Sequence, residues 1–505
     1  MVITSSLFFF GYLIHHEHDK SADICYDKKG GDSNHQCIIP SFDETFQKYA
    51  YYDIFRLSVA TTSFVIATST RTMILSPIKL LESSISNQIL PTQIIHKMNA
   101  VIEKLELFSN EIWEDIAIKS NLLREDNEEE SSTSSYYHHP PEIDLNVFVP
   151  CEEDVARVYI SERQRRKMSN NQQENDNDII DGGNACRLRD VITQNLLVEY
   201  AKVIDVEFDL ASHPIILRNL WPPETFNDNE RRLTPNGIMN DPQLSNLILP
   251  NYFSDATKYG YDALKPDVLT KTTLSEFLEG ILSGNTPNAK IGSQVIVDQI
   301  PELRNEIIPA SMAKNLFGWN TYLEDAKKSL HSWLGDTVGG WIDKILPPMS
   351  YFPVFIASNQ QSLPGAINTH LRTDLHMEPI GNIAAQLHGT RQWTLVPTTW
   401  SKLLRPTVSK DRGYFYSNID PALLHERLSR IPVVYNCTTR KGDVIWIPPW
   451  TWHRVDYDGE YSEESLSIGA SIFHFFPKLY MTSNPLFSLL ILPNLIQEVL
   501  GFNIE

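Results

Sequence analysis

Three residues in the last third of the chain are of the types that bind a metal ion. His376 and Glu378 are separated by one residue in the segment THLRTDLHMEPIGN (369–382). On a β-strand, residues at this spacing leave the same face, so the imidazole and the carboxylate can reach one ion. His453 follows an apolar segment and a Pro-Pro pair in GDVIWIPPWTWHRV (442–455). Two histidines and one carboxylate form the facial ligand set of a mononuclear Fe(II) site, which keeps other coordination positions open.

The His-x-Glu spacing alone is common, and each residue also has a simpler interpretation. His376 can be a buried histidine with satisfied hydrogen bonds, and Glu378 can be a surface carboxylate at a strand end. Two further sets of histidines are weaker candidates. His388 is interpreted as a packing or surface residue, because its strand face depends on whether a bulge intervenes. The HHEH tract (15–18) is interpreted as a solvated tract.

The residues around both segments resemble the pattern of the JmjC and cupin-like hydroxylase family. The segment TDLHMEPIGNIAAQLHGTRQWTLVP is similar to the first half of that pattern, and GDVIWIPPWTWHRV resembles its second half. The residues of the first segment that fall in register are Thr373, His376, Glu378, Pro379, Asn382, Gln386, Gly389, Trp393, Leu395 and Pro397. Between the two, YFYSNID (414–420) resembles a short segment of such proteins. The resemblance covers residues 350–475 clearly and 206–475 more loosely.

This resemblance implies an Fe(II) centre and 2-oxoglutarate as a co-substrate. His376, Glu378 and His453 match the iron ligands of the family. Thr373 and Asn382 match positions that form hydrogen bonds with 2-oxoglutarate in relatives.

Arg391 is a departure from the family pattern. Relatives most often have a lysine there, which pairs with the distal carboxylate of 2-oxoglutarate. Arginine keeps the positive charge and offers a bidentate fork to a carboxylate, but it is bulkier, so the pocket must differ. The family also has a polar residue late in the last strand, facing the iron site. In SLSIGASIF it is Ser467 or Ser471, which share a strand face with Gly469.

The resemblance implies an Fe(II)- and 2-oxoglutarate-dependent dioxygenase that hydroxylates a side chain of a protein substrate. The alternative is a non-catalytic cupin-fold binding or scaffold protein that retains a metal, and the departure at Arg391 favours it. A third interpretation is a metal-dependent cupin enzyme that uses no 2-oxoglutarate. A net charge of −20 and a pI of about 5.2 argue against a nucleic-acid partner, because a phosphate backbone needs a basic surface.

The segments that must position these residues have β character. YFPVFIASNQ, IAAQLHGTRQWTLVP, GDVIWIPP and SLSIGASIFHFF are short runs rich in Ile, Val, Phe and Trp, with turn residues between them. With the resemblance, they predict an α+β fold: a C-terminal double-stranded β-helix (cupin or jelly-roll) with surrounding helices, and a mostly helical N-terminal region. The aromatic cluster Trp446, Trp450 and Trp452 is expected to pack in its core or rim.

Composition divides the chain into five regions. They are a candidate signal peptide or anchor over 1–20, a helical region over 40–123, a polar linker over 124–186, a JmjC/cupin-like domain over 187–480 and a C-terminal apolar helix over 481–505. Apolar spacing predicts helices over 93–119, 272–282 and 322–346, and a strand within 206–220. The basic cluster RQRRK (163–167) is expected in a solvated loop.

The apolar run from Val2 to Ile14 has the length of a signal-peptide core, but no Lys or Arg precedes it and no small-x-small cleavage site follows. Membrane or secretory association through this end of the chain is therefore possible. The endomembrane lumen is slightly preferred over the cytoplasm. Residues 57–75 are moderately apolar but rich in Thr and Ser, so we expect buried helix there and no membrane span.

The chain has five cysteines and no CxxC pair, which argues against a structural zinc cluster. Cys25 and Cys37 can form a disulfide in an oxidising compartment, but the preferred interpretation is five unrelated thiols. The chain has a single N-x-S/T sequon, Asn436-Cys437-Thr438, which matters only in a secretory lumen.

Overall fold

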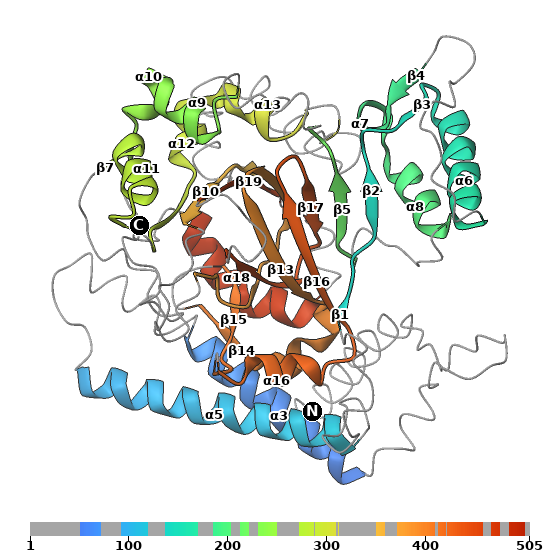
Figure 1. The fold of residues 1–505 in the computed structure, drawn as a ribbon. Coiled ribbons are helices and arrows are strands. Elements are labelled where there is room, and N and C mark those ends of the chain that lie inside the picture. The colour runs from blue at the N-terminus through green and yellow to red at the C-terminus, as the bar shows by residue number, and fades with distance from the viewer. Residues whose placement is uncertain are drawn as a thin grey trace, which may run out of the picture.

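Two large β-sheets form the centre of the structure, which is a computed structural model, and helices surround them (Figure 1). The structure describes residues 51–71, 92–119, 137–169, 185–203, 213–221, 231–249, 272–286, 288–309, 312, 350–358, 371–409, 413–420, 422–457, 466–474 and 484–499. The helix expected over 322–346, the HHEH tract, the run from Val2 to Ile14, and both Cys25 and Cys37 lie outside these residues.

The first sheet has seven strands in the order β1-β16-β13-β18-β11-β15-β14. Its strands are β1 (Tyr137–His138), β11 (His376–Met377), β13 (Thr390–Val396), β14 (Pro406–Val408), β15 (Phe415–Ser417), β16 (Val434–Arg440) and β18 (Trp452–Asp456). Every pairing in it is antiparallel except that of β1 with β16.

The second sheet has eight strands in the order β2-β5-β17-β12-β19-β10-β8, and β9 also pairs with β19. Its strands are β2 (Glu142–Asp144), β5 (Ile215–Arg218), β8 (Lys290–Ser293), β9 (Ser350–Tyr351), β10 (Val354–Ser358), β12 (Gly381–His388), β17 (Val444–Ile447) and β19 (Leu466–His474). Only β2 and β5 pair in parallel. Two small ribbons complete the set: β3 (Phe148–Pro150) with β4 (Ala185–Arg187), and β6 (Ile248–Leu249) with β7 (Thr272–Thr273).

Strand alternation divides the buried apolar side chains into three layers. Trp446 packs in the cluster on the outer face of the eight-stranded sheet, whereas its neighbour Ile445 packs in an inner cluster. In the seven-stranded sheet, Trp452 points to the outer cluster and Val455 to the inner one. Because the inner cluster takes residues from strands of both sheets, it lies between them. The same alternation decides which polar side chains enter that inner space.

Helices cover the outer face of each sheet. The helices beside the eight-stranded sheet are α6 (Glu153–Ser169), α7 (Leu188–Val191), α8 (Gln194–Val203), α9 (Pro235–Asn240), α10 (Pro242–Ser245), α11 (Leu274–Leu282), α12 (Val295–Gln299), the 3-10 helix η4 (Pro301–Leu303) and α13 (Arg304–Ile307). The helix expected over 272–282 is confirmed as α11. Its N-terminus is fixed by a capping box in which Thr273 and Glu276 satisfy each other's backbone N–H groups.

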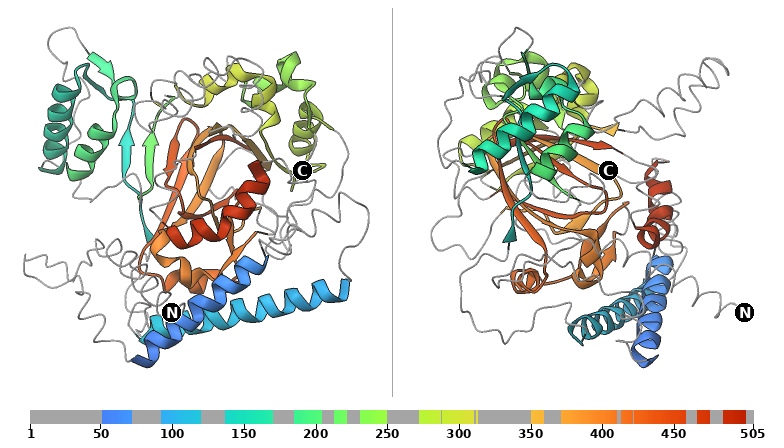
Figure 2. Two further views of the ribbon diagram at one scale, coloured as in Figure 1. Left: turned by 180° about the vertical axis from the view of Figure 1, so that it is seen from behind. Right: turned by 90° about the vertical axis from the view of Figure 1, so that its right-hand side faces the viewer.

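Two helices that precede the sheet and three from the C-terminal part of the chain cover the outer face of the seven-stranded sheet (Figure 2). They are α3 (Tyr51–Thr70), α5 (Thr92–Lys119), the 3-10 helix η5 (Thr398–Leu404), α16 (Leu424–Ser429) and α18 (Pro485–Val499). Phe64 of α3 lies 5.2 Å from Trp113 of α5, and Phe487 of α18 lies 4.7 Å from Phe415 of β15, between ring centroids. The helix predicted over 93–119 is confirmed as α5. Among the described helices, none combines the length and the apolar character that a membrane span needs.

Residues 137–169 and 185–187 differ from the polar linker expected over 124–186. They form β1 to β4 and α6, and the RQRRK cluster lies within α6 instead of a loop. The prediction missed these elements because their polar side chains dominate the composition. These elements are stabilised instead by backbone pairing with β5 and β16 and by a few buried residues such as Ile143 and Ile160.

The cysteines also differ from the prediction of five unrelated thiols. Cys151 and Cys186 form a disulfide between residues 35 positions apart in the sequence. The pairing of β3 with β4 places Cys186 opposite Val149, two residues before Cys151. This proximity depends on the ribbon, so it is not visible in the sequence spacing. Among the described cysteines, Cys437 is a buried free thiol.

One carboxylate ties the N-terminal helices to the sheets. Glu114 of α5 lies 2.7 Å from a guanidinium nitrogen of Arg427 in α16 and 3.4 Å from one of Arg405, which follows η5. Burial raises the pKa of Glu114, but the hydrogen bond and charge of Arg427, followed by those of Arg405, outweigh burial and lower it. A carboxyl whose folded pKa is lowered stabilises the fold above its unfolded pKa, and this contribution is lost as the pH falls through the folded pKa.

We therefore expect Glu114→Gln to lower the free energy of unfolding at pH 7 by about 1.5–3 kcal/mol, the range for a hydrogen bond to a charged group. The difference from the unmodified protein should shrink below about pH 4, where free glutamate protonates. Urea unfolding at pH 7 and below pH 4 measures this difference in the free energy of unfolding. Glu111→Gln, an exposed glutamate on the same helix, is the control. An equal loss in both variants would show that Glu114 does not anchor α5.

Candidate metal centre

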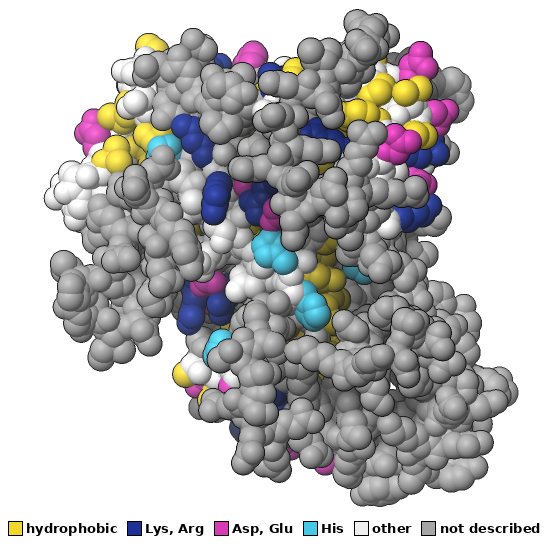
Figure 3. Space-filling view, turned by 45° about the vertical axis from the view of Figure 1, so that its right-hand side comes forward, with side chains coloured by type: hydrophobic (Ala, Val, Ile, Leu, Met, Phe, Trp, Pro, Cys, Tyr) yellow, Lys and Arg dark blue, Asp and Glu magenta, His cyan; other side chains and the backbone are white. Residues whose placement is uncertain are grey.

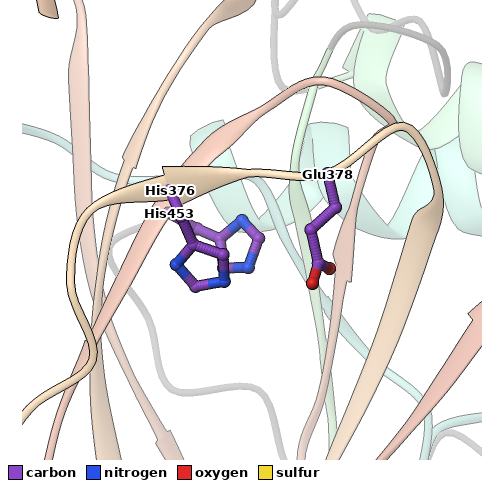
Figure 4. A group of neighbouring side chains, drawn as sticks. All are labelled: His376, Glu378 and His453. Atoms are coloured by element: carbon purple, nitrogen blue, oxygen red, sulfur yellow. The ribbon is translucent and has the colours of Figure 1, made fainter. Parts of the chain in front are cut away.

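Strand register brings the three expected ligands to one point. β11 and β18 are antiparallel neighbours, and His376 lies directly opposite His453. Glu378 follows at the end of β11, where the chain turns toward β12. The two imidazole rings are 4.3 Å apart between centroids, and the carboxylate of Glu378 points toward them (Figure 4). One ligand atom from each residue lies within 4.8 Å of the other two.

A hydrogen bond between the two motif segments fixes the backbone at Glu378. The N–H of Trp450 donates to the Glu378 carbonyl at 2.7 Å. Trp450 has a φ of 65°, a left-handed conformation that costs a residue with a Cβ about 1–2 kcal/mol. Complete burial against Phe415 and Phe487 holds it there, and Thr398 donates to its carbonyl at 2.6 Å. The Pro-Pro turn and this tryptophan thus position the start of β18.

Both histidines are oriented by backbone carbonyls. Nδ1 of His376 lies 2.8 Å from the carbonyl oxygen of Asp374, and Nδ1 of His453 lies 3.0 Å from that of Thr451. A carbonyl oxygen only accepts, so each Nδ1 carries the proton and donates. Each Nε2 is then left with a lone pair for a metal ion. Such outer hydrogen bonds fix the tautomer and the ring orientation of metal-binding histidines.

The imidazoles are neutral at physiological pH. Burial lowers the pKa of His453 to about 4. Burial also lowers the pKa of His376 well below its usual value, with a further contribution from the charge of His453. Neutral imidazole is the form that binds metals. His376 and Glu378 are partly exposed whereas His453 is buried. On the face drawn in Figure 3, histidine side chains reach the surface among acidic and basic ones.

The donor set fits a divalent transition-metal ion. Two neutral imidazole nitrogens and one carboxylate oxygen converge, and three protein ligands leave further coordination positions for small molecules. The histidine tautomers that the structure imposes are those that a metal requires. His376, Glu378 and His453 would therefore hold the ion.

Thr373 and Asn382, predicted to form hydrogen bonds with a co-substrate, lie on strands and loops next to those of the triad. The Thr373 hydroxyl accepts from the N–H of Val455 at 2.8 Å, which leaves its own proton for another acceptor. Asn382 is 4% exposed, and alternation along β12 places it on the same face as Ala384, a member of the inner cluster. Its Oδ1 is buried and has no hydrogen-bond partner among the described residues.

Arg391 of β13 also enters the inner space and is 2% exposed. Its Nε lies 3.3 Å from the hydroxyl oxygen of Ser467, and its Nη2 donates to the Phe355 carbonyl at 2.9 Å. Its guanidinium carbon lies 5.7 Å from the ring centre of Phe355 and 5.4 Å from that of Tyr457. No carboxylate of the described residues pairs with it. Burial lowers its pKa, and Tyr457 partly offsets this.

The structure also resolves points that the sequence left open. Both late-strand serines lie on the inner face of β19, because Ile468 and Ala470 between them pack in the outer cluster. Ser467 contacts Arg391 and accepts from Gln386 at 3.0 Å. A bulge falls between Gln386 and His388, which breaks the strand parity of His388. The three tryptophans of the second motif are buried in the two outer clusters, so packing accounts for them.

Sequence reasoning missed Phe355 and Tyr457, the aromatic neighbours of Arg391. It also missed Lys290 of β8, whose ammonium lies 5.6 Å from the Tyr457 ring centre and whose charge contributes to lowering the pKa of His376. Strand alternation in YFPVFIASNQ places Phe355 and Ala357 on one face, but only the packing of the two sheets shows that this face is the inner one.

Comparison with known families agrees with this arrangement. A family model described as a cupin-like domain matches residues 204–475. The match covers more than half of the chain, so the protein belongs to the cupin-like family. A search of curated proteins gives no match.

Replacement of either histidine should abolish tight metal binding. We expect His376→Ala and His453→Ala each to weaken Mn(II) or Fe(II) affinity by more than about a hundredfold, because loss of an outer hydrogen-bond partner alone costs about 10–100-fold. Metal content by mass spectrometry and anaerobic calorimetry measure this. His425→Ala, an exposed histidine of α16, should bind like the unmodified protein. Retention of one equivalent of metal in both site variants would contradict the assignment.

Proposed function

We propose that this protein is an Fe(II)- and 2-oxoglutarate-dependent dioxygenase of the JmjC hydroxylase type that acts on a protein side chain. One observation supports the proposal above the others. A metal-ligand triad and a buried guanidinium without a carboxylate partner face the same space between the two sheets. Leu395 lies opposite His453 and, like Arg391 four residues before it in β13, points to the inner space.

The strand order supports a double-stranded β-helix, the fold of such enzymes. Four strands of one sheet, in the order β10-β19-β12-β17, face four of the other, in the order β11-β18-β13-β16. From β10 to β13 and from β16 to β19, each strand along the chain lies in the opposite sheet from the strand before it. This winding places β11 and β18 side by side, and these strands carry the two histidines.

The electrostatics of Arg391 support an anionic co-substrate. A buried charge is costly unless it is paired, and an arginine remains charged at neutral pH. An incoming carboxylate would accept hydrogen bonds from the remaining N–H groups of the guanidinium and supply the missing negative charge. 2-Oxoglutarate has a keto acid at one end to reach the metal and a carboxylate at the other end to reach Arg391.

The polar residues beside the triad would orient the same molecule. Asn382 is buried on the inner face of β12, and its amide N–H groups could donate to an oxygen of the co-substrate. The hydroxyl proton of Thr373 is available in the same way, because its oxygen accepts from the Val455 N–H. When bound, Fe(II) couples O₂ reduction to decarboxylation of 2-oxoglutarate, giving succinate, CO₂ and a hydroxylated substrate.

A protein side chain is the proposed substrate because the net charge of −20 opposes a nucleic-acid partner. The second candidate is a non-catalytic cupin-fold binding protein that retains a metal. Arg391, in place of the family lysine, is the observation that favours it. In that case the guanidinium fills the co-substrate pocket with its contacts to Ser467 and Phe355 and admits no ligand.

Anaerobic addition of Fe(II) and then 2-oxoglutarate should give the weak visible metal-to-ligand charge-transfer band of a chelated keto acid. Arg391→Ala should keep its metal affinity but weaken 2-oxoglutarate binding by at least about thirtyfold, because truncating one partner of a buried charge pair costs about 2–5 kcal/mol. Arg440→Ala, an exposed arginine of β16, is the control.

If the unmodified protein binds metal but does not give this band, 2-oxoglutarate is not its co-substrate. That result would favour the second candidate, the non-catalytic binding protein. Succinate formation supplies an independent readout. If Arg391→Lys creates 2-oxoglutarate turnover that the unmodified protein lacks, the second candidate is correct. If the unmodified protein turns over 2-oxoglutarate and the lysine variant loses it, that candidate is excluded.

A further inference from the structure

Gly469 of β19 lies against the Arg391 guanidinium in the inner space. In the strand register it is opposite Phe355 of β10 on one side and Gln386 of β12 on the other. A Cβ added at Gly469 would lie 2.6 Å from Nη1 of Arg391 and 2.7 Å from both its central carbon and its Nη2. Contacts below about 3 Å do not occur for real Cβ atoms, so any side chain at this position would displace the guanidinium.

Two hydrogen bonds and two aromatic rings define the position of the guanidinium. Ser467 and the Phe355 carbonyl hold two of its nitrogens, and the rings of Phe355 and Tyr457 lie within 6 Å of it on two sides. The arginine is also almost completely buried. A displaced guanidinium would therefore lose at least one of its hydrogen bonds.

Backbone conformation does not explain the glycine. Other glycines of the domain need a left-handed backbone, such as Gly389 with a φ of 66°. Gly469 pairs on both edges and its φ is not positive, and the extra residue of the bulge beside it belongs to β12, not to β19. The space that the guanidinium occupies is thus the reason for a residue without a side chain.

We propose that Gly469 is a positioning residue that sets where Arg391 presents its charge to the co-substrate. The inference rests on the proposed 2-oxoglutarate site. Arginine at position 391 and glycine at position 469 form a coupled pair: the wider guanidinium needs the missing Cβ, whereas a lysine there would not. The pair explains how this chain accommodates an arginine where relatives have a lysine.

Four proteins test the coupling: the unmodified chain, Gly469→Ala, Arg391→Lys and the double variant. Anaerobic titration measures affinity for Fe(II) and then for 2-oxoglutarate, and melting without ligand measures the fold. Gly469→Ala should bind the metal normally, melt at a lower temperature and bind 2-oxoglutarate about tenfold or more weakly, because a charge-assisted hydrogen bond is lost. In the lysine background the same alanine should change 2-oxoglutarate affinity by less than about twofold.

The outcomes separate this inference from the proposed function. If the metal-loaded unmodified protein does not bind 2-oxoglutarate, the proposed function fails and the inference fails with it. If it binds 2-oxoglutarate and the alanine has equal effects in both backgrounds, only the inference is overturned. Should Gly469→Ala fail to fold, restored folding of the double variant supports the coupling, and failure of both variants overturns it.

A different observation carries a second inference, on Asn436. This residue begins the only N-x-S/T sequon of the chain. It lies on β16 with its side chain exposed, whereas Cys437 between it and Thr438 points inward and is 4% exposed. The glycan acceptor is therefore at an exposed position of the outer face that the covering helices leave open to solvent, where a bulky sugar can extend.

The disulfide Cys151–Cys186 points to the compartment in which such a sequon is used. Disulfides persist in oxidising compartments and are rare in the cytosol. The remaining described cysteine, Cys437, is buried, and burial raises the pKa of its thiol, which keeps it from reacting. We infer that the chain matures in the secretory pathway and carries an N-linked glycan on Asn436.

Expression of the full chain in a eukaryotic host tests this second inference. Treatment with an N-glycosidase should shift the mass of the unmodified protein by one glycan and leave Asn436→Gln and Thr438→Ala unshifted. Thr438→Ser keeps the sequon and should keep the shift. Non-reducing peptide mapping should recover Cys151 and Cys186 in one linked species. An unmodified protein without glycan, or with both of these cysteines as free thiols, would overturn the inference.

Discussion

The pairing of β11 with β18 is the interaction on which the metal centre depends, because it alone places His376 opposite His453. These strands are short, so their alignment needs support from outside the ladder. The Trp450 N–H supplies it by bonding to the Glu378 carbonyl. The left-handed backbone at Trp450 is unfavourable for a bulky residue, and complete burial of the ring maintains it. Packing on the outer face of the sheet thus holds the ligands on its inner face.

The inner space combines an apolar cluster with groups that are costly to bury. Two neutral imidazoles, an amide without a partner for its oxygen, and a guanidinium without a carboxylate share this space. Such groups are costly to bury without partners, and the ligands of the proposed function would satisfy them. In the proposed function, the metal would bind the imidazoles, and the carboxylate of the co-substrate would pair with the guanidinium.

The peripheral elements support the sheets in different ways. α3, α5 and α18 pack on the outer face of the seven-stranded sheet, where Glu114 adds an ionic contact. β1 and β2 extend the two sheets by parallel pairing, although their sequence is largely polar. The domain that surrounds the metal centre is therefore completed by residues that precede the part matching the cupin-like family.

The sequence by itself determined the candidate ligands, the strands within its apolar runs after residue 350 and the helix over 93–119, because these follow from residue chemistry and periodicity within short windows. It also identified Arg391 as a departure from the family pattern, which most often has a lysine there. Only the tertiary structure decided that Ser467 and Gly469 contact that arginine, that Cys151 pairs with Cys186, and that residues 137–169 are ordered. Each of these depends on which strands are neighbours, and strand neighbours far apart in the chain leave no periodic pattern in the sequence.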